Sequence, residues 1–265
     1  MNKLNNLISI VVPVYNESDS IRLLINEIIN VMKSHQLLFE LIIVNDGSVD
    51  STSNVLENLS LEIKQLTVIN LRKNYGQTAA LAAGFDHSNG DIIVTLDGDL
   101  QNDPNDIPKL ITNINEGYDL ICGWRFQRKD KLLNRRIPSQ IANRLIGNVT
   151  GIHLHDYGCS LKAFKHEIIK DIKLYGELHR FLPVLANIEG AKIKEIKVNH
   201  RSRKYGQSKY GIDRTFRVLM DLLTVWFMNK FLTRPMYVFG FIGIISIISS
   251  FIMSSYLIVL KFLGE

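Results

Sequence analysis

Polar side chains follow three apolar runs of this 265-residue chain, and carboxylates are common among them. Residues 7–14 precede Tyr15-Asn16-Glu17, residues 39–44 precede Asn45-Asp46-Gly47-Ser48, and residues 91–96 precede Asp97-Gly98-Asp99-Leu100-Gln101. Each cluster alone is typical of a loop or a capped turn. Four carboxylates gathered in one place would repel one another, so such a group usually holds a cation or hydrogen-bonds a ligand. Carboxylate and amide oxygens suit Mg²⁺ or Mn²⁺, and a metal that bridges a diphosphate is the natural partner.

The elements that must position these clusters alternate along the chain. Apolar runs predict strands at 7–14, 39–44, 67–71, 91–96 and 119–122. Helices are expected between them at 18–33, 51–59, 77–86 and 107–115, the first capped by Ser18. Strands separated by helices imply an α/β, Rossmann-like fold with a mostly parallel sheet. Ligands of such sheets bind at the carboxyl ends of the strands, where the three clusters converge if their strands are neighbours.

Charge and hydropathy divide the chain further. Residues 1–121 have a net charge of −9 and residues 122–217 a net charge of +13. Residues 236–260 contain no charge and are long enough to cross the ~30 Å hydrocarbon core of a bilayer. Basic residues precede this span and the N-terminus lacks a cleavable signal pattern, so we expect an integral protein of the cytoplasmic membrane whose catalytic domain faces the cytoplasm.

The basic half could face anionic lipid or an anionic substrate. Nucleic acid is disfavoured, because the basic residues are not interleaved with aromatic ones and a membrane span follows. The amphipathic stretch 216–231 could lie in the bilayer interface or pack on the catalytic core. The composition, 46% apolar and 22% charged, excludes a disordered chain, and two cysteines exclude a disulfide framework.

Six motifs, in order along the chain, resemble those of glycosyltransferase family 2, which has the GT-A fold. They are IVVPVYNES, IIVNDGSVDST, NYGQTAALAAGFDHSNGDIIVTLDGDLQNDP, DYGCSLKAF, HRFLPVLA and HRSRKYGQSKYG. The last three resemble polyprenyl-phosphate glycosyltransferases, a group that includes dolichyl-phosphate mannose synthases and bacterial undecaprenyl-phosphate sugar transferases. The resemblance covers about residues 7–235, and DYGC is nearest to enzymes that load formamido-arabinose onto undecaprenyl phosphate.

The resemblance implies a role for each matching residue. The nucleoside would be held by Pro13, Tyr15, Glu17 and Asp46, with Val44 lining its base. The ribose and diphosphate would lie against Asp97 and Gly98, and Mg²⁺ or Mn²⁺ would be bound by Asp99 and Gln101, with Asp97. The sugar diphosphate would be contacted by Arg125, Arg203 and Lys209. The lipid phosphate would meet Arg136 and Ser139.

These roles predict a metal-dependent, inverting transfer of one sugar from a UDP- or GDP-sugar to a polyprenyl phosphate such as undecaprenyl phosphate. The expected catalytic residues are Asp99, Asp156, Arg125 and Arg203. Asp156 could act as a general base, or it could orient the acceptor or a basic residue, since a phosphate acceptor is already largely ionised. A polysaccharide or diacylglycerol acceptor, or a non-catalytic membrane scaffold with this fold, stays open as an alternative.

The expected organisation is a catalytic domain at 1–211, an amphipathic juxtamembrane helix at 212–235 and a transmembrane helix at 236–260. Within the catalytic domain, residues 1–121 form the nucleotide- and metal-binding half and residues 122–211 the basic acceptor half. Membrane lipid is an expected partner, and so is a second copy of the chain in a homo-oligomer.

Overall fold

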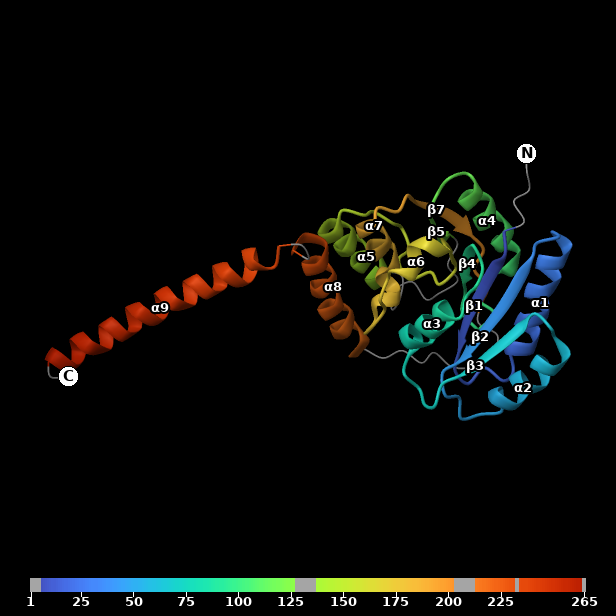
Figure 1. Ribbon diagram of the computed structural model, residues 1–265, viewed down its shortest axis with the longest axis horizontal. Helices are drawn as coiled ribbons and strands as arrows, with labels where there is room; N and C mark the ends of the chain where they lie inside the picture. Colours follow the sequence, from blue (N-terminus) through green and yellow to red (C-terminus); the bar gives the residue numbers. More distant parts are fainter. Residues whose placement is uncertain (1–5, 127–136, 203–212, 232–233, 264–265) are drawn as a thin grey trace.

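The computed structural model describes residues 6–126, 137–202, 213–231 and 234–263, without the side chains of 137–141 and 213–219. An α/β domain contains the sheet, and one long helix projects from its end, so that the two chain termini lie at opposite ends (Figure 1). The strands are β1 (Ile8–Val14), β2 (Phe39–Asn45), β3 (Leu66–Asn70), β4 (Ile92–Thr95), β5 (Leu120–Arg125), β6 (Lys162–Lys165) and β7 (Ile193–Val198). The helices are α1 (Ile21–Ser34), α2 (Thr52–Glu62), α3 (Gln77–Asp86), α4 (Ile107–Asn115), α5 (Ile137–Thr150), α6 (His166–Lys170), α7 (Leu182–Ile188), α8 (Asp213–Phe231) and α9 (Met236–Leu263), with 3-10 turns η1 (Pro104–Asp106) and η3 (Leu178–Phe181).

The strands form one sheet in the order β3-β2-β1-β4-β6-β5-β7. β6 runs antiparallel to both of its neighbours, and the other pairs are parallel. The mostly parallel α/β fold is therefore confirmed. β1 lies between β2 and β4, so the three polar clusters that follow these strands meet at one edge of the sheet, as predicted.

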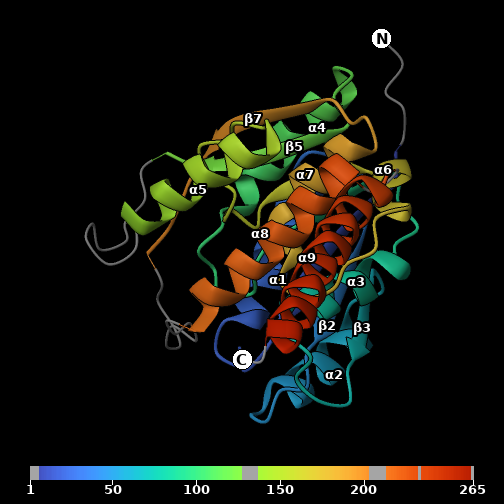
Figure 2. The same cartoon turned by 90° about the vertical axis from the view of Figure 1, so that its left-hand side faces the viewer.

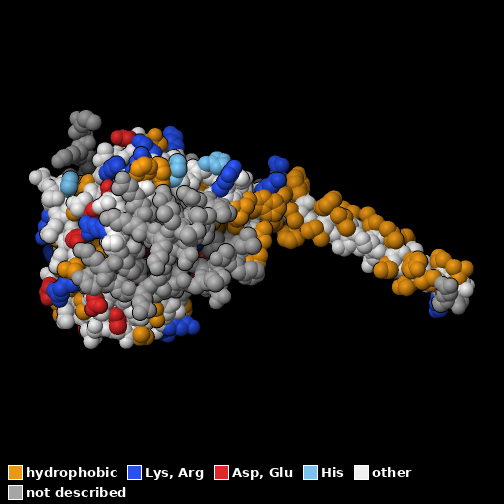
Figure 3. Space-filling model, turned by 180° about the vertical axis from the view of Figure 1, so that it is seen from behind, with side chains coloured by type: hydrophobic (Ala, Val, Ile, Leu, Met, Phe, Trp, Pro, Cys, Tyr) orange, Lys and Arg blue, Asp and Glu red, His pale blue; other side chains and the backbone are white. Residues whose placement is uncertain are grey.

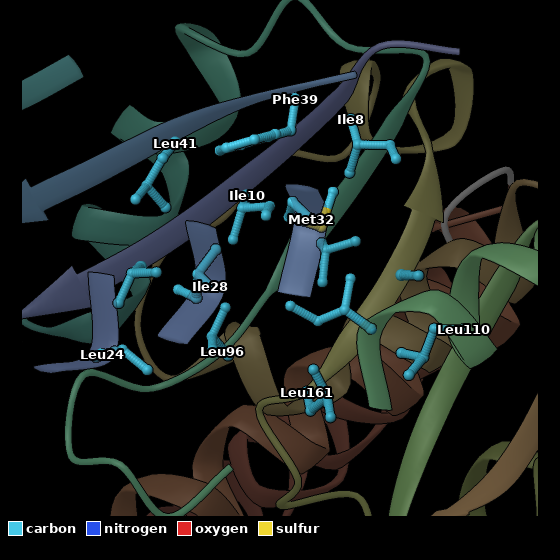
Figure 4. Packing of buried hydrophobic residues seen from close by; sticks show 14 of the residues in the cluster. Ile8, Ile10, Leu24, Ile28, Met32, Phe39, Leu41, Leu96, Leu110 and Leu161 are labelled. Atoms are coloured by element: carbon cyan, nitrogen blue, oxygen red, sulfur yellow. The ribbon is translucent and has the colours of Figure 1, made fainter. Parts of the chain in front are cut away.

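Two hydrophobic layers cover the sheet because successive strand residues point to opposite faces. Ile8, Ile10 and Val12 of β1 pack with α1, α2 and α4 on one face (Figure 4). Val11 points the other way and packs with α3, α6 and α7. A third cluster joins η3, α5, α7 and α8 around Tyr157, Phe181 and Val225. The sheet edge that carries the polar clusters is thus held from both faces.

The structure corrects several predicted bounds. The first helix begins at Ile21 with Ser20 at its N-cap position, so Ser18 lies outside it. β5 continues to Arg125, past the predicted end at 122, and the expected boundary between an acidic and a basic half falls inside this strand. Both halves therefore contribute to one sheet.

The C-terminal helices α8 and α9 lie at one end of the domain, to its left in Figure 1 and toward the viewer in Figure 2. α8 buries Leu222 and Val225 against the domain, while Met220, Leu223 and Trp226 are exposed. α9 spans 28 residues, about 42 Å at 1.5 Å per residue. Its mean hydropathy is 2.2 over the most apolar window, none of that window is buried within the domain, and apolar side chains cover its length (Figure 3). α9 is therefore long and apolar enough to cross a bilayer.

Candidate functional site

The loop after β4 is held from several directions at the centre of the polar edge. The Ser20 hydroxyl donates to the Gly98 carbonyl oxygen at 3.0 Å, and Gln77 Nε2 donates to Asp97 Oδ1 at 2.7 Å. The Asp97 N–H donates to Asn102 Oδ1 at 3.2 Å. A Cβ on Gly98 would lie 2.7 Å from Val14 Cγ1, so glycine permits the close approach of this loop to β1.

A tight turn joins Asp99 to Gln101. Leu100 between them has φ of 61°, a left-handed conformation that is unfavourable for a residue with a side chain, and its side chain is buried in the core. The Gln101 N–H donates to Asp99 Oδ1 at 3.1 Å. The turn brings a nearly buried carboxylate and a carboxamide to the same edge, where their oxygens could hold a cation.

The four carboxylates of the edge hydrogen-bond the chain itself. Glu17 accepts from the Ser20 hydroxyl at 2.9 Å, and Asp97 and Asp99 accept from Gln77 and Gln101 as described. Among the described residues, no three His, Cys, Asp or Glu side chains form a group that could hold a metal. A cation held by Asp99 and Gln101 would take its remaining ligands from substrate phosphates, as is usual for Mg²⁺ sites.

Asp46 organises the loop that follows β3. Its Oδ1 accepts from the Tyr75 N–H at 2.7 Å and its Oδ2 from the Gly76 N–H at 2.9 Å. Burial raises the pKa of Asp46, although these hydrogen bonds oppose the shift. Gly47 beside it has φ of +65°, and a Cβ there would overlap the main chain of Lys73. Asp46 and Gly47 therefore let the two loops touch.

A hollow of about 410 Å³ opens between these loops at the ends of β1, β2 and β3. Its lining consists of Tyr15, Asn45, Gly47, Ser48, Val49, Ser53, Asn70, Leu71, Arg72, Lys73 and Asn74. Of the residues expected to hold the nucleoside, Tyr15 lies in this lining, and Pro13 is paired with Val44 in the β1–β2 ladder. The side chain of Val44, which the resemblance placed against the base, is fully buried against α3 and is not part of this lining.

The sequence prediction missed Arg72, Lys73 and Asn74. They follow the third strand as the other polar clusters follow theirs, so the same argument from strand ends could have found them.

Arg125 and Asp156 form a buried ion pair beside Asp97. Arg125 Nε donates to Asp156 Oδ2 at 2.6 Å and Nη2 to Oδ1 at 2.8 Å, while their side chains are 15% and 3% exposed. Burial alone would lower the pKa of Arg125, but the hydrogen bonds and charge of Asp156, with a smaller contribution from Asp97, raise it above its usual value. The sequence left three roles open for Asp156, as a general base or in orienting the acceptor or a basic residue, and this geometry favours orientation of a basic residue.

Glu195 of β7 accepts hydrogen bonds from the main chain at Asp156. It accepts from the Asp156 N–H at 2.9 Å and from the His155 N–H at 3.0 Å. His155 Nδ1 lies 2.7 Å from Glu195 Oε2, and the ring stacks on Trp124 at 4.0 Å between centroids. The main chain that carries Asp156 is thereby fixed to β5 through Trp124 and to β7 through Glu195.

The side chains of four other predicted site residues are not described by the structure. Arg136, Arg203 and Lys209 lie outside the described residues. Ser139 falls near the start of α5, and its side chain also lies outside the description.

Comparison with known proteins relates this edge to a family. The model of the family described as glycosyl transferase family 2 matches residues 9–173, which contain every described element of the edge from Tyr15 to Asp156. The chain is 47% identical over 241 residues to a dodecaprenyl-phosphate galacturonate synthase of Rhizobium johnstonii, a match that covers 89% of this chain and 71% of the relative.

Two further relatives are described as undecaprenyl-phosphate 4-deoxy-4-formamido-L-arabinose transferases. The one from Proteus mirabilis is 37% identical and the match covers 97% of this chain and 77% of the relative. The one from Salmonella choleraesuis is 38% identical, with coverage of 96% and 76%.

A solved structure shares the fold at low sequence identity. Glucosyl-3-phosphoglycerate synthase from Mycobacterium tuberculosis, in complex with Mn²⁺, uridine diphosphate and phosphoglyceric acid, superposes with a TM-score of 0.64. It is 18% identical, and the match covers 84% of this chain and 78% of the synthase chain.

Proposed function

The chain belongs to glycosyl transferase family 2, and we propose that it is an inverting glycosyltransferase that moves one sugar from a nucleoside diphosphate sugar to a polyprenyl phosphate. The observation that carries the proposal is the polar edge, where Gln77 links the loop beside the hollow to Asp97 and the charge of Asp97 acts on Arg125 of the ion pair. The relatives named after dodecaprenyl and undecaprenyl phosphate support the choice of acceptor.

The donor nucleoside fits the hollow between the loops after β1, β2 and β3. Tyr15 offers an aromatic face for a base, and Arg72 and Lys73 offer positive charge next to it. The loop from Arg72 to Gln77 runs from the hollow to Asp97, which Gln77 contacts. A diphosphate attached to the nucleoside would therefore reach the Asp97–Gln101 loop.

Negative charge builds on the leaving diphosphate as its bond to the sugar breaks. A divalent cation held by Asp99 and Gln101, with Asp97 nearby, would neutralise part of that charge. The carboxylate and amide oxygens suit Mg²⁺ or Mn²⁺, and the structurally similar synthase is described with Mn²⁺. Arg125 adds a fixed positive charge, because Asp156 holds its guanidinium in one orientation.

The acceptor phosphate attacks the anomeric carbon directly, and this displacement inverts its configuration. The phosphate has a second pKa near ~6, so at neutral pH it needs little help to lose a proton. Arg136, Ser139, Arg203 and Lys209 are the proposed contacts to the acceptor and the sugar diphosphate. Asp156 therefore orients Arg125 and does not act as a general base on the acceptor phosphate.

The membrane would bring the acceptor to this site. We propose that α9 spans the bilayer with the catalytic domain on the cytoplasmic side, and that the exposed Leu223 and Trp226 of α8 lie in the interface. The other face of α8 packs on the domain through Leu222 and Val225, so this helix would connect the bilayer to the domain.

A glycolipid assay tests the proposal. The full chain in detergent is incubated with undecaprenyl phosphate, Mg²⁺ or Mn²⁺, and a panel of donors that includes UDP-galacturonate, UDP-formamido-arabinose and GDP-sugars. We expect a metal-dependent glycolipid by mass spectrometry, its loss in Asp99→Ala, and its retention in Glu62→Ala, which changes a surface ion pair. Nucleotide binding without glycolipid from any donor would contradict the polyprenyl acceptor and favour a polysaccharide or diacylglycerol acceptor or a scaffold role.

A further inference from the structure

The chain segment after β7 lies against the loop that carries Gln101. His200 forms an antiparallel bridge with Asn102, and the Arg201 N–H donates to the Gln101 carbonyl oxygen at 2.9 Å. Asn199 continues the contact, because its N–H donates to Asp106 Oδ2 at 2.7 Å and its Nδ2 to Asp103 Oδ2 at 2.8 Å. Residues about 100 positions apart in the sequence are thus joined at the end of β4.

The guanidinium of Arg201 closes this contact with two carboxylates from different elements. Nη1 lies 2.6 Å from Glu27 Oε2 on α1, and Nη2 lies 2.7 Å from Asp103 Oδ1. Through these two ion pairs, Arg201 joins the segment after β7 to α1 and to the loop that follows Gln101.

The amide of Gln101 is oriented by the same residue. Its Nε2 donates to the Arg201 carbonyl oxygen in a long hydrogen bond of 3.4 Å. Once the nitrogen of a carboxamide is used as a donor, the amide oxygen is turned away from that contact and can accept or coordinate elsewhere. Arg201 thus contacts Gln101 twice, at the main-chain oxygen and at the side-chain nitrogen.

We propose that Arg201 is a positioning residue for the divalent cation, because its ion pairs with Glu27 and Asp103 fix the segment that contacts Gln101, whose amide oxygen would bind the cation. The inference rests on the proposed function, in which Asp99 and Gln101 hold that cation. Partners outside the coordination shell orient metal ligands, and their loss costs about 10–100-fold in metal affinity.

Binding of Mn²⁺ tests this inference without turnover. The full chain in detergent is titrated with Mn²⁺ in the presence of UDP or GDP, and free Mn²⁺ is followed by electron paramagnetic resonance. We expect Arg201→Ala to weaken Mn²⁺ binding about 10–100-fold. Arg201→Lys, which can keep one of the two ion pairs, should fall between Arg201→Ala and the wild type. The affinity for nucleotide without metal should not change in either variant.

Two control variants separate the possible failures. Arg22→Ala removes a surface ion pair with Glu62 from the same helix as Glu27 and should bind Mn²⁺ like the wild type. If Asp99→Ala weakens Mn²⁺ binding and Arg201→Ala does not, the role of Arg201 is refuted and the proposed metal site stands. If neither variant changes the affinity, the metal site itself is refuted, and the inference with it.

A milder variant keeps the test decisive if Arg201→Ala does not fold. Glu27→Gln removes one of the two ion pairs from the exposed side of the contact. Glu27→Gln and Arg201→Lys should each weaken Mn²⁺ binding by a smaller factor than the one expected for Arg201→Ala. Metal-free nucleotide binding should be preserved in both. Wild-type Mn²⁺ affinity in both variants, or an equal loss of metal-free nucleotide binding, would overturn the proposal.

Discussion

Replacing Asp156 with asparagine should destabilise the protein and misorient Arg125. The carboxylate accepts from Arg125 Nε and Nη2 at 2.6 and 2.8 Å and from the Gly158 N–H at 3.1 Å, and its side chain is 3% exposed. Removing one partner of a buried ion pair leaves the other charge uncompensated, which costs about 3–5 kcal/mol. At about 2–4 °C per kcal/mol for a chain of this size, the melting temperature should fall by about 6–20 °C.

The stability of a double variant, compared with that of each single variant, makes the prediction specific. Arg125→Gln alone leaves the Asp156 charge buried, whereas Arg125→Gln with Asp156→Asn removes both charges. Neutral replacement of a whole buried pair is often tolerated, so the double variant should be more stable than either single variant. Thermal unfolding of the full chain in detergent measures this, and Glu62→Gln at a surface pair should stay within about 1 kcal/mol of the wild type.

The activities of the same single and double variants provide a second test. If Asp156 acts through Arg125, Asp156→Asn should lower kcat by about 10²–10³-fold, as does loss of one oriented group that stabilises the transition state. The double variant should then be no slower than Arg125→Gln. Additive losses of kcat, together with wild-type stability of Asp156→Asn, would refute the ion-pair role and favour Asp156 as a general base.

Three further predictions concern other parts of the domain. The pKa of Asp103 is lowered, because hydrogen bonds and a nearby cation outweigh burial, so its contribution to stability is present at neutral pH and is lost only as pH falls below about 4. The difference in melting temperature between wild type and Asp103→Asn should therefore be constant from about pH 8 to 5 and shrink below about pH 4. Burial raises the pKa of Cys122 to about 12 and of Cys159 to about 11, so neither thiol should react with a disulfide reagent at pH 8 until denaturant is added. Gly47→Ala should force the loop at Lys73 away from the hollow, raise KM for the donor at least about tenfold and leave kcat nearly unchanged.

The first half of the fold could be predicted because its signals are local. Buried parallel strands are continuous apolar runs, and the helices between them carry their own periodicity, so the predictions at 77–86 and 107–115 coincide with α3 and α4. The meeting of the polar clusters also follows from local signals. It needs, in addition, that the three strands are neighbours, which the order β2-β1-β4 satisfies, and the general rule that ligands bind at the carboxyl ends of parallel strands.

The second half could not be predicted in the same way, because its contacts are long-range. β6 has four residues, with Lys162 buried among them, so it has no apolar run to reveal it. Its place between β4 and β5 depends on pairing with strands that are distant in sequence. The ion pair of Arg125 with Asp156 and the contact of Arg201 with Gln101 arise from that pairing, and no residue spacing indicates them.

Val44 shows a different limit. A residue at the end of a strand can point to the ligand edge or into a core layer, and the sequence motif alone does not distinguish them. Its side chain enters the layer under α3, while the loop residues Arg72 and Lys73 reach the hollow instead.

The position of β6 also sets the order in which the sheet can assemble during synthesis. β1 to β4 pair among themselves, so this four-stranded unit can form once about the first 95 residues have left the ribosome. β5 pairs with β6 and β7 and with none of the earlier strands, so it must wait for residues 162–165 before it has a partner. A nascent chain that stops before β6 would display an unpaired edge on β4 and an apolar strand with no sheet to join, which are the features that chaperones recognise and that lead to aggregation.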